Sequence, residues 1–193
     1  MNIVLLAGSP SAESRSTRLL QHVGDRLAAC GLQPRLLQVR DLPAAALLHA
    51  DFADPDIRAT QDSIARAHAV VIATPVYQAS LAGVLKAFLD LLPQTALAGK
   101  PVLPLAVGGG QSHMLALDYA LRPVLAALGS PHVLPSIYAT EAQIKRNGES
   151  GLILDAAIAE RVANGIGQLN AALRAAEPSS AASPSEPAQL RIA

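Results

Sequence analysis

Cysteine is almost absent from this chain, and neither sign of charge dominates it. Cys30 is the single cysteine among 193 residues, which excludes an intramolecular disulfide and a thiolate metal cluster. Basic and acidic residues balance at 15 each, so the sequence lacks the positive field typical of proteins that bind nucleic acids or anionic membranes. We therefore expect a small ligand, with no nucleic-acid and no membrane partner.

Long apolar runs and several catalytic motifs are also missing. No apolar run approaches the roughly 20 residues that span a bilayer, and the apolar stretch at residues 3–7 is too short for a signal-peptide core. We expect a cytoplasmic protein. The five histidines show no metal-ligand spacing, and no Ser-His-Asp, His-Glu-x-x-His or Cys-x-x-Cys arrangement is visible. The sequence thus predicts no metal site and no side chain acting as a general acid or base.

Short apolar runs alternate with longer amphipathic stretches through most of the chain. Apolar strands separated by helices are typical of a parallel sheet covered on both faces, and right-handed crossovers favour a doubly wound topology. We predict one α/β domain over residues 1–176, with a flavodoxin-like five-stranded parallel sheet in the order 2-1-3-4-5. The expected strands are 3–7, 35–39, 69–74, 102–107 and 133–138, and the expected helices are 16–29, 56–67, 81–92, 112–128 and 154–175. Residues 41–55 are expected to be irregular.

Two local features carry expectations of their own. Pro104 lies inside the fourth strand, where it removes a hydrogen-bond donor, so we expect a bulge or a shortened ladder. Residues 177–193 are rich in Pro, Ser and Ala and are expected to form a disordered tail. The alternative is a tail that docks on a neighbouring subunit through Leu190 and Ile192.

The loop after the first strand is rich in hydroxyl groups and leads into a helix. Backbone N–H groups and hydroxyls at a helix N-terminus form a phosphate site, and one guanidinium can add a charge-assisted hydrogen bond. The loop lacks the glycine patterns of Walker A and of the dinucleotide fingerprint, so a terminal monophosphate fits it best. The alternative is a plain strand-to-helix turn with an N-cap serine. The candidate phosphate-binding residues are Ser9, Ser14, Arg15, Ser16 and Thr17.

A second loop follows the third strand and is expected to meet the first at the carboxyl edge of the sheet, where the strand order reverses. It contains Pro75, Val76 and Tyr77. A proline of fixed φ followed by an aromatic residue is suited to lying alongside a flat ring. The alternative for Tyr77 is a surface tyrosine that closes the strand.

A third loop follows the fourth strand and begins with Gly108, Gly109 and Gly110. Glycines lack Cβ, so their backbone can approach a planar ligand closely, and their N–H groups could stabilise the charge that a reduced flavin carries near N1 and O2. A flexible turn is the alternative. His113 follows as a candidate contact to flavin or nicotinamide, although a histidine in a first helical turn is more often polar surface.

The three loops belong to a larger set of motifs. These are Ala-Gly-Ser-Pro with Ser-Arg-Ser (7–10, 14–16), Ala-Thr-Pro-Val-Tyr (73–77), Gly-x-Leu-Lys with Leu-Asp-Leu-Leu-Pro (83–86, 89–93), and Asp-Tyr-Ala-Leu-Arg-Pro-Val-Leu (118–125). Taken together, they resemble those of the NAD(P)H-dependent FMN reductases. The likeness covers about residues 1–175 and is greatest to the reductase component of the two-component alkanesulfonate monooxygenase system.

This resemblance implies a function and a role for each loop. The first loop would bind the FMN phosphate, and the second and third would border the isoalloxazine. A hydride would pass from NADPH or NADH to FMN, with NADPH favoured by the resemblance alone. FMN would be a substrate that leaves reduced for a partner FMNH₂-dependent monooxygenase, within sulfonate sulfur assimilation. The protomers would form dimers or tetramers.

Two other functions are compatible with the same loops. A flavodoxin-like electron carrier would keep FMN bound and dock to redox partners, but such carriers are usually strongly acidic, unlike this neutral chain. A quinone or azo-dye reductase would also keep FMN tightly bound.

The stretch from Ser112 to Leu128 carries an apolar seam. This seam suits packing against the same helix of another subunit, or burial within its own chain. Its members are Met114, Leu117, Leu121, Val124 and Leu128.

The same stretch contains Pro123, which has no N–H to give the Tyr119 carbonyl and whose ring would clash with it. A kink or π-bulge is therefore expected near Tyr119. Members of the resembling subfamily carry a π-helix at a matching tyrosine, at the subunit interface near the flavin. The resemblance assigns Tyr119 a role in flavin release and transfer.

Overall fold

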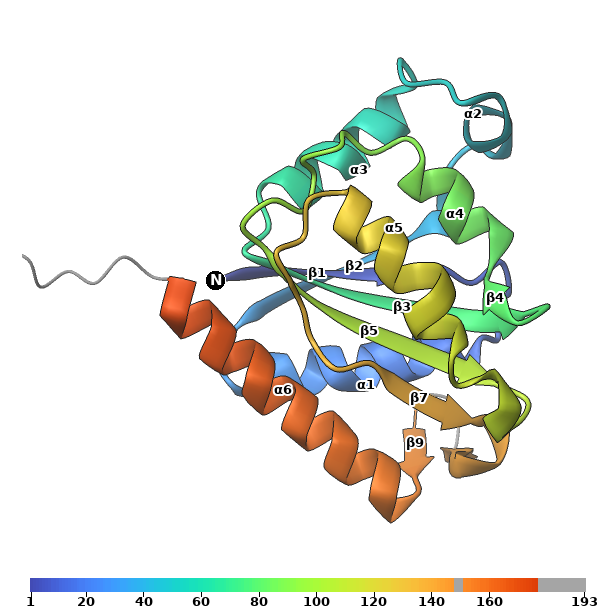
Figure 1. Cartoon of the computed structure of the whole chain (residues 1–193), viewed down its shortest axis with the longest axis vertical. Coiled ribbons are helices and arrows are strands. Elements are labelled where there is room, and N and C mark those ends of the chain that lie inside the picture. Colours follow the sequence, from blue (N-terminus) through green and yellow to red (C-terminus); the bar gives the residue numbers. More distant parts are fainter. Residues whose placement is uncertain (148–150, 177–193) are drawn as a thin grey trace, which may run out of the picture.

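Parallel strands form the central sheet of the computed structural model, which describes residues 1–147 and 151–176. The order is β2-β1-β3-β5 with β7 beside β5 (Figure 1), and β6 pairs with β5 as well, so β6 and β7 share the fifth position. Counted along the chain, this is the predicted order 2-1-3-4-5 with the fifth strand in two pieces. The expectation for residues 177–193 lies outside the described residues. The strands are β1 (Asn2–Ala7), β2 (Gln33–Gln38), β3 (Ala69–Tyr77), β5 (Pro101–Gly108), β6 (His132–Val133) and β7 (Ile137–Thr140).

The break in the fifth strand lies beside Pro104. The Leu134 N–H donates to the Val102 carbonyl at 2.9 Å, so the backbone polar groups of Val102 face the fifth strand. Alternate residues of a strand direct these groups to the same side, so Pro104 also faces the fifth strand. Between Val133 and Ile137 no ladder pair joins that strand to β5. On the other side the register of β3 and β5 is unbroken. The register shifts by one residue across this gap, because Val102 pairs with Val133 but Leu105 pairs with Ile137. The ladder is thus interrupted at Pro104 as expected, and the extra residue lies in the fifth strand opposite it.

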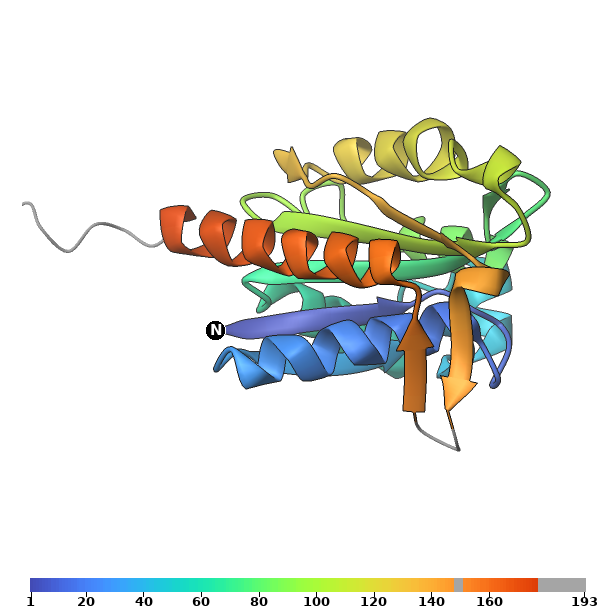
Figure 2. The ribbon, with the colours of Figure 1, turned by 90° about the horizontal axis from the view of Figure 1, so that it is seen from below.

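Helices cover both faces of the sheet. On one face lie α1 (Arg15–Ala29) and α6 (Ala156–Ala176), which are nearest the viewer in Figure 2. On the other lie α3 (Pro55–Ala65), α4 (Gly83–Leu89) and α5 (Arg122–Ala127). Each long helix buries residues three or four apart, such as Leu20, Val23 and Leu27 of α1, because that spacing returns to the same helix face. None of the helices in the described ranges is long and apolar enough to cross a membrane.

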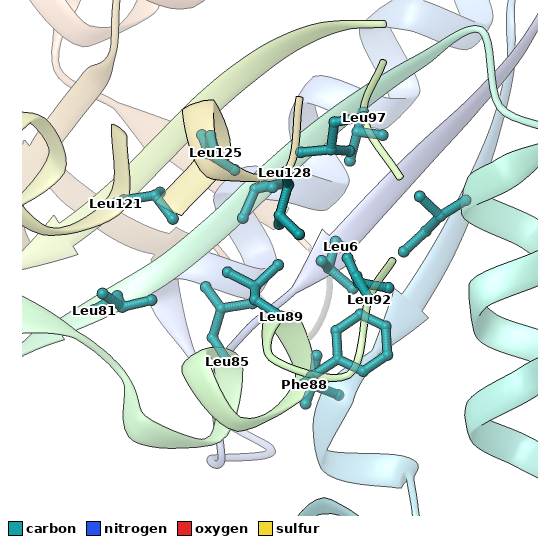
Figure 3. Packing of buried hydrophobic residues seen from close by; sticks show 14 of the residues in the cluster. Leu6, Leu81, Leu85, Phe88, Leu89, Leu92, Leu97, Leu121, Leu125 and Leu128 are labelled. Carbon is teal, nitrogen blue, oxygen red and sulfur yellow. The ribbon is translucent and has the colours of Figure 1, made fainter. Parts of the chain in front are cut away.

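The packing of α4 fixes where the first loop begins. Figure 3 shows Leu85, Phe88 and Leu89 of α4 close to Leu6 of β1, and all four side chains are almost completely buried. A Cβ on Gly8 would lie 2.6 Å from Leu85 Cδ2. Only glycine therefore allows α4 to lie this close to the end of β1, which positions the loop that follows.

The long helix predicted over residues 112–128 is interrupted. A 3₁₀ turn, η2 (Gln111–His113), and a π-helix, η3 (Leu117–Leu121), precede α5. The Arg122 N–H donates to the Leu117 carbonyl five residues back, so the turn is wider than an α-helical turn. The prediction of a kink or π-bulge near Tyr119 is confirmed.

The apolar seam of this segment packs mainly inside its own chain. Leu117, Leu121 and Leu128 are buried, and Val124 packs partly buried against the same cluster. Met114 is 48% exposed. Of the two interpretations of the seam, burial within the chain is correct for all its members except Met114.

Several short elements were not predicted. The region expected to be irregular contains η1 (Val39–Asp41) and α2 (Ala44–His49), which are too short for their apolar residues to show a period. After β7, a turn η4 (Glu141–Gln143) leads into a hairpin of β8 (Ile144–Asn147) and β9 (Gly151–Leu154). Within the described residues the two hairpin strands pair with each other, and at four residues each they are too short to show a clear sequence pattern. The last helix starts after this hairpin, at Ala156.

Candidate active site

Buried hydroxyls gather where β1 gives way to α1. Ser14 is the N-cap, and its Oγ accepts a hydrogen bond from the Thr17 N–H at 3.2 Å. Ser14 Oγ and Ser16 Oγ lie 2.8 Å apart, and Ser9 Oγ accepts from the Ser11 N–H at 3.2 Å. The first turn of α1 contains no acidic residue, so the positive end of the helix dipole is available to an anion. Ser14 therefore does cap α1, and the same turn still offers polar groups suited to a phosphate.

Arg15 extends from the first position of α1 across the mouth of this turn. Its Nη1 lies 2.8 Å from Oε2 of Glu141, and the two side chains are 43% and 54% exposed. Glu141 lies in η4, directly after β7. The ion pair therefore joins the loops that follow the first and fifth strands. No local sequence pattern indicates Glu141, because its role depends on a contact with a residue 126 positions away.

The second wall of the site is the end of β3 and its turn into β4 (Ser80–Leu81) rather than a free loop. Thr74 fixes this turn: its Oγ1 donates to the Pro75 carbonyl at 2.8 Å and accepts from the Ala82 N–H at 3.0 Å. Gln78 and Ala79 have φ values of 46° and 59°, a left-handed conformation that is strained for residues with a Cβ. The turn presents Tyr77 with 49% of its surface exposed.

The glycines of the third wall have different structural roles. A Cβ on Gly108 would lie 2.3 Å from Tyr138 Oη, so this glycine makes room for a side chain of β7. Tyr138 donates to the Gly110 carbonyl at 2.5 Å, and burial raises the pKa of its hydroxyl. A Cβ on Gly109 would have no neighbour within 4 Å, and φ is not positive at any of the three. Nothing within the described chain requires glycine at position 109, which leaves that position open to a ligand.

A single cavity brings together most of the candidate residues. Thr17 lies instead beside a neighbouring hollow along α1 with Arg18 and Gln38. Gly110, His113 and Tyr119 do not line the cavity, and their roles remain predictions. The cavity is lined by Ser9, Ser14, Arg15, Ser16, Pro75, Val76, Tyr77, Gly108 and Gly109, together with Ser11, Glu13, Val107 and Glu141.

The two ends of this cavity have different chemistry. One end offers serine hydroxyls, a helix N-terminus and a guanidinium, the donor set that a phosphate monoester requires. The other end offers an exposed aromatic ring and an open glycine backbone, which suit one face and one edge of a planar ring system. The residues present therefore fit a planar ligand with a terminal phosphate, such as FMN.

A doubly wound sheet with such a cavity at the carboxyl ends of its strands defines the class of flavodoxin-like proteins. An archaeal flavodoxin shares this fold with a TM-score of 0.61 at 12% identity, covering 89% of this chain and 99% of the flavodoxin. Residues 1–144 match the model of a family described as NADPH-dependent FMN reductase, and the chain belongs to this family.

Relatives in sequence and structure agree with this assignment. The chain is 48% identical over 144 residues to an FMN reductase (NADPH) of Pseudomonas putida KT2440, which covers 75% of this chain and 73% of the relative. It is 40% identical over 144 residues to an FMN reductase (NADPH) of Escherichia coli K12, covering 75% of each. The solved structure of an apo NADH:FMN oxidoreductase, EMOB, has a TM-score of 0.79 at 37% identity and covers 93% of this chain and 91% of its own.

The enzyme class expected from the sequence motifs is confirmed. The protein is an NAD(P)H-dependent FMN reductase, an oxidoreductase whose cofactors are FMN and NADPH or NADH.

Proposed function

We propose that FMN is a dissociable substrate of this protein, and that the reduced product leaves for a separate FMNH₂-dependent monooxygenase. The observation that supports this most directly is the openness of the site at both ends. Tyr77 on the ring side is 49% exposed, and the Arg15 side chain on the phosphate side is 43% exposed. A ligand held between such groups keeps access to solvent, which favours release over permanent retention.

The chain's own groups bind and position the ligand. When bound, FMN supplies a ring system that accepts a hydride from reduced nicotinamide. Ser14, Ser16 and the N-terminus of α1 would hold the phosphate, and Arg15 would add a charge-assisted hydrogen bond. Tyr77 would border one side of the ring, and the Gly109 backbone would border its edge. No side chain needs to act as an acid or base, because positioning two cofactors suffices for hydride transfer.

NADPH is the proposed nucleotide. The FMN reductases at 48% and 40% identity carry NADPH in their names, whereas a Pseudomonas putida relative at 33% identity is named NADH-dependent FMN reductase SfnF. The proposed partner acts on sulfonates, in line with the resemblance of the sequence motifs to the alkanesulfonate system. The cytoplasm is the proposed compartment, in keeping with a single cysteine.

Association of copies through the segment 112–128 is also part of the proposal. Its buried seam is used within the chain, but its outward side carries Met114, Leu115 and Tyr119, exposed by 48%, 53% and 78%. Neighbouring exposed apolar side chains of this kind mark an interaction surface. We assign Tyr119, within the π-helix, to flavin release and transfer at this surface.

Oxidation of NADPH and, separately, NADH tests the central claim. The flavin content of the purified protein is recorded first, and turnover under air is then measured with and without added FMN. Colourless protein whose rate saturates with added FMN, faster with NADPH, is the expected result. Yellow protein that is indifferent to added FMN would instead support an electron carrier or a quinone reductase with tightly bound FMN.

Two variants test the outward surface. Sedimentation velocity is expected to give a dimer or tetramer for the native protein and a smaller species for Leu115→Glu. Leu48→Glu is the matched control, since Leu48 is 80% exposed on α2, which lies apart from α5 in Figure 1, and should leave the mass unchanged. For Tyr119→Ala we expect altered FMN retention or altered delivery to the monooxygenase, and unchanged values of both would refute its role.

A further inference from the structure

Charged residues of both signs line the cavity, although its expected ligand carries a dianionic phosphate. Arg15 is the basic residue of the lining, and Glu13 and Glu141 are acidic. Glu13 pairs with Arg18 Nη2 at 3.1 Å, whereas Glu141 pairs with Arg15 itself at 2.8 Å. The guanidinium expected to meet the phosphate is thus already bound to a carboxylate of the same chain.

The placement of Glu141 is fixed by its backbone. Thr140 and Gln143 form a capping box around η4, in which the Thr140 N–H donates to Gln143 Oε1 at 3.0 Å. The Gln143 carbonyl in turn accepts from the Asp155 N–H at 2.9 Å, which ties the turn to the start of α6. Glu141 therefore extends from a turn braced on both sides, so its carboxylate stays within reach of Arg15.

We propose that Glu141 is an internal competitor of the flavin phosphate for the Arg15 guanidinium. The inference rests on the proposed function, in which FMN must bind and leave in every cycle. Bidentate bonding of arginine to phosphate is stronger than an exposed ion pair, so phosphate displaces the carboxylate when FMN binds. When FMN leaves, the carboxylate takes the guanidinium back. Glu141 thereby weakens FMN binding and assists release, and it is a positioning residue without a part in hydride transfer.

The competition should be visible in binding measured without nucleotide. Quenching of flavin fluorescence gives the Kd, and because the chain has no tryptophan, protein emission interferes little. Glu141→Gln should tighten FMN binding about fivefold, the change expected when an opposing interaction of about 1 kcal/mol is removed. Riboflavin has no phosphate, and its Kd should change by less than about twofold. Equal tightening of both flavins, no change for FMN, or weaker FMN binding would each overturn the proposal.

The Arg15→Gln variant distinguishes competition for the guanidinium from direct repulsion between Glu141 and the phosphate. Arg15→Gln should weaken FMN binding about tenfold or more, the loss typical of a hydrogen bond to a charged group. In this background Glu141→Gln should change FMN binding by less than about twofold, because no guanidinium remains to compete for. The same fivefold gain as in the native background would show that the carboxylate acts on the phosphate directly, which overturns the proposal.

Asp62→Asn is the matched control for loss of one surface carboxylate. Asp62 forms an exposed ion pair with Arg66 at 4.0 Å on α3, and its replacement should leave both flavin affinities unchanged. The proposed function and the competition by Glu141 can be refuted separately. Native protein that retains FMN through purification and does not exchange it would refute the proposed function. Native protein that exchanges FMN, with an affinity insensitive to Glu141→Gln, would refute only the competition.

Discussion

Replacing Gly108 with alanine should destabilise the fold through one identifiable contact. The new Cβ would lie 2.3 Å from Tyr138 Oη, 3.1 Å from Cζ and 3.3 Å from Cε2. Tyr138 is only 5% exposed, so its ring has little room to move away. Any movement would also lengthen the hydrogen bond from its hydroxyl to the Gly110 carbonyl.

Two effects set the size of this loss. Overpacking a buried site costs about 1–3 kcal/mol, and leaving a buried hydrogen bond unmade costs about 1–3 kcal/mol. We expect Gly108→Ala to lower the free energy of unfolding by about 2–4 kcal/mol. Tyr138→Phe alone loses the hydrogen bond and should cost about 1 kcal/mol. The double variant, Gly108→Ala with Tyr138→Phe, lacks Oη, the atom closest to the new Cβ. Gly108→Ala should therefore cost about 1–2 kcal/mol less in the Tyr138→Phe protein than in the native protein.

Urea unfolding followed by circular dichroism at 222 nm measures all four proteins of this cycle. The decisive quantity is the coupling free energy between positions 108 and 138. Additive losses would refute the claim that the Tyr138 hydroxyl is what requires glycine at position 108. A loss below about 0.5 kcal/mol for Gly108→Ala would refute it as well, since that is the range of neutral surface changes.

Gly109→Ala is the control for this cycle and a test of the site. A Cβ there meets no atom within 4 Å, and φ is not in the left-handed region, so stability should stay within about 0.5 kcal/mol of the native value. The added methyl group would point into the space where we expect the ring edge of FMN. FMN and riboflavin should therefore both bind more weakly, and unchanged affinities would place the ring elsewhere.

Three further changes have defined outcomes. Ala79→Gly should raise the free energy of unfolding by about 1 kcal/mol in urea titrations, because glycine relieves the left-handed strain at φ 59°; a loss of stability would contradict this. Thr74→Val should lower it by about 1–3 kcal/mol, because the buried Ala82 N–H loses its acceptor, and an unchanged urea midpoint would refute this role. Burial, and next the charge of Arg26, lower the pKa of His22 in the folded protein. As the pH falls below about 6.5, His22 is therefore protonated in the unfolded chain before it is protonated in the folded protein, which lowers the stability of the fold. His22→Gln should therefore lose less stability than the native protein between about pH 7.5 and pH 5.5, and equal losses would contradict the shift.

Much of the fold could be predicted because its signals are local. Continuous apolar strands and amphipathic helices follow one another along the chain, and Pro123 by itself was enough to predict the widened turn at Tyr119. The hydroxyl-rich turn was equally visible, since Ser14 caps a helix that begins at the next residue. The interruption of the ladder at Pro104 was visible as well, because a proline within a strand lacks the N–H that the ladder needs.

The remaining features depend on contacts between distant segments. Glu141 reaches Arg15 only because the first and fifth strands end at the same edge of the sheet. Nothing near Tyr138 in the sequence indicates that its hydroxyl bonds Gly110. Likewise, the seam of segment 112–128 had two possible partners, and only the position of the sheet decides that Leu121 faces its own core. Periodicity shows that a face is apolar without showing what covers it.

The divided fifth strand has a consequence for how the site opens. β7 has four residues and, among the described strands, pairs with β5 alone, so its opening would break a single ladder. It carries Tyr138, which anchors the glycine turn, and it ends directly before Glu141. Local unfolding of such an edge segment costs less free energy than opening a central strand. The amides of β7 and the glycine turn should therefore exchange their hydrogens together, as one cooperative unit at the rim of the cavity.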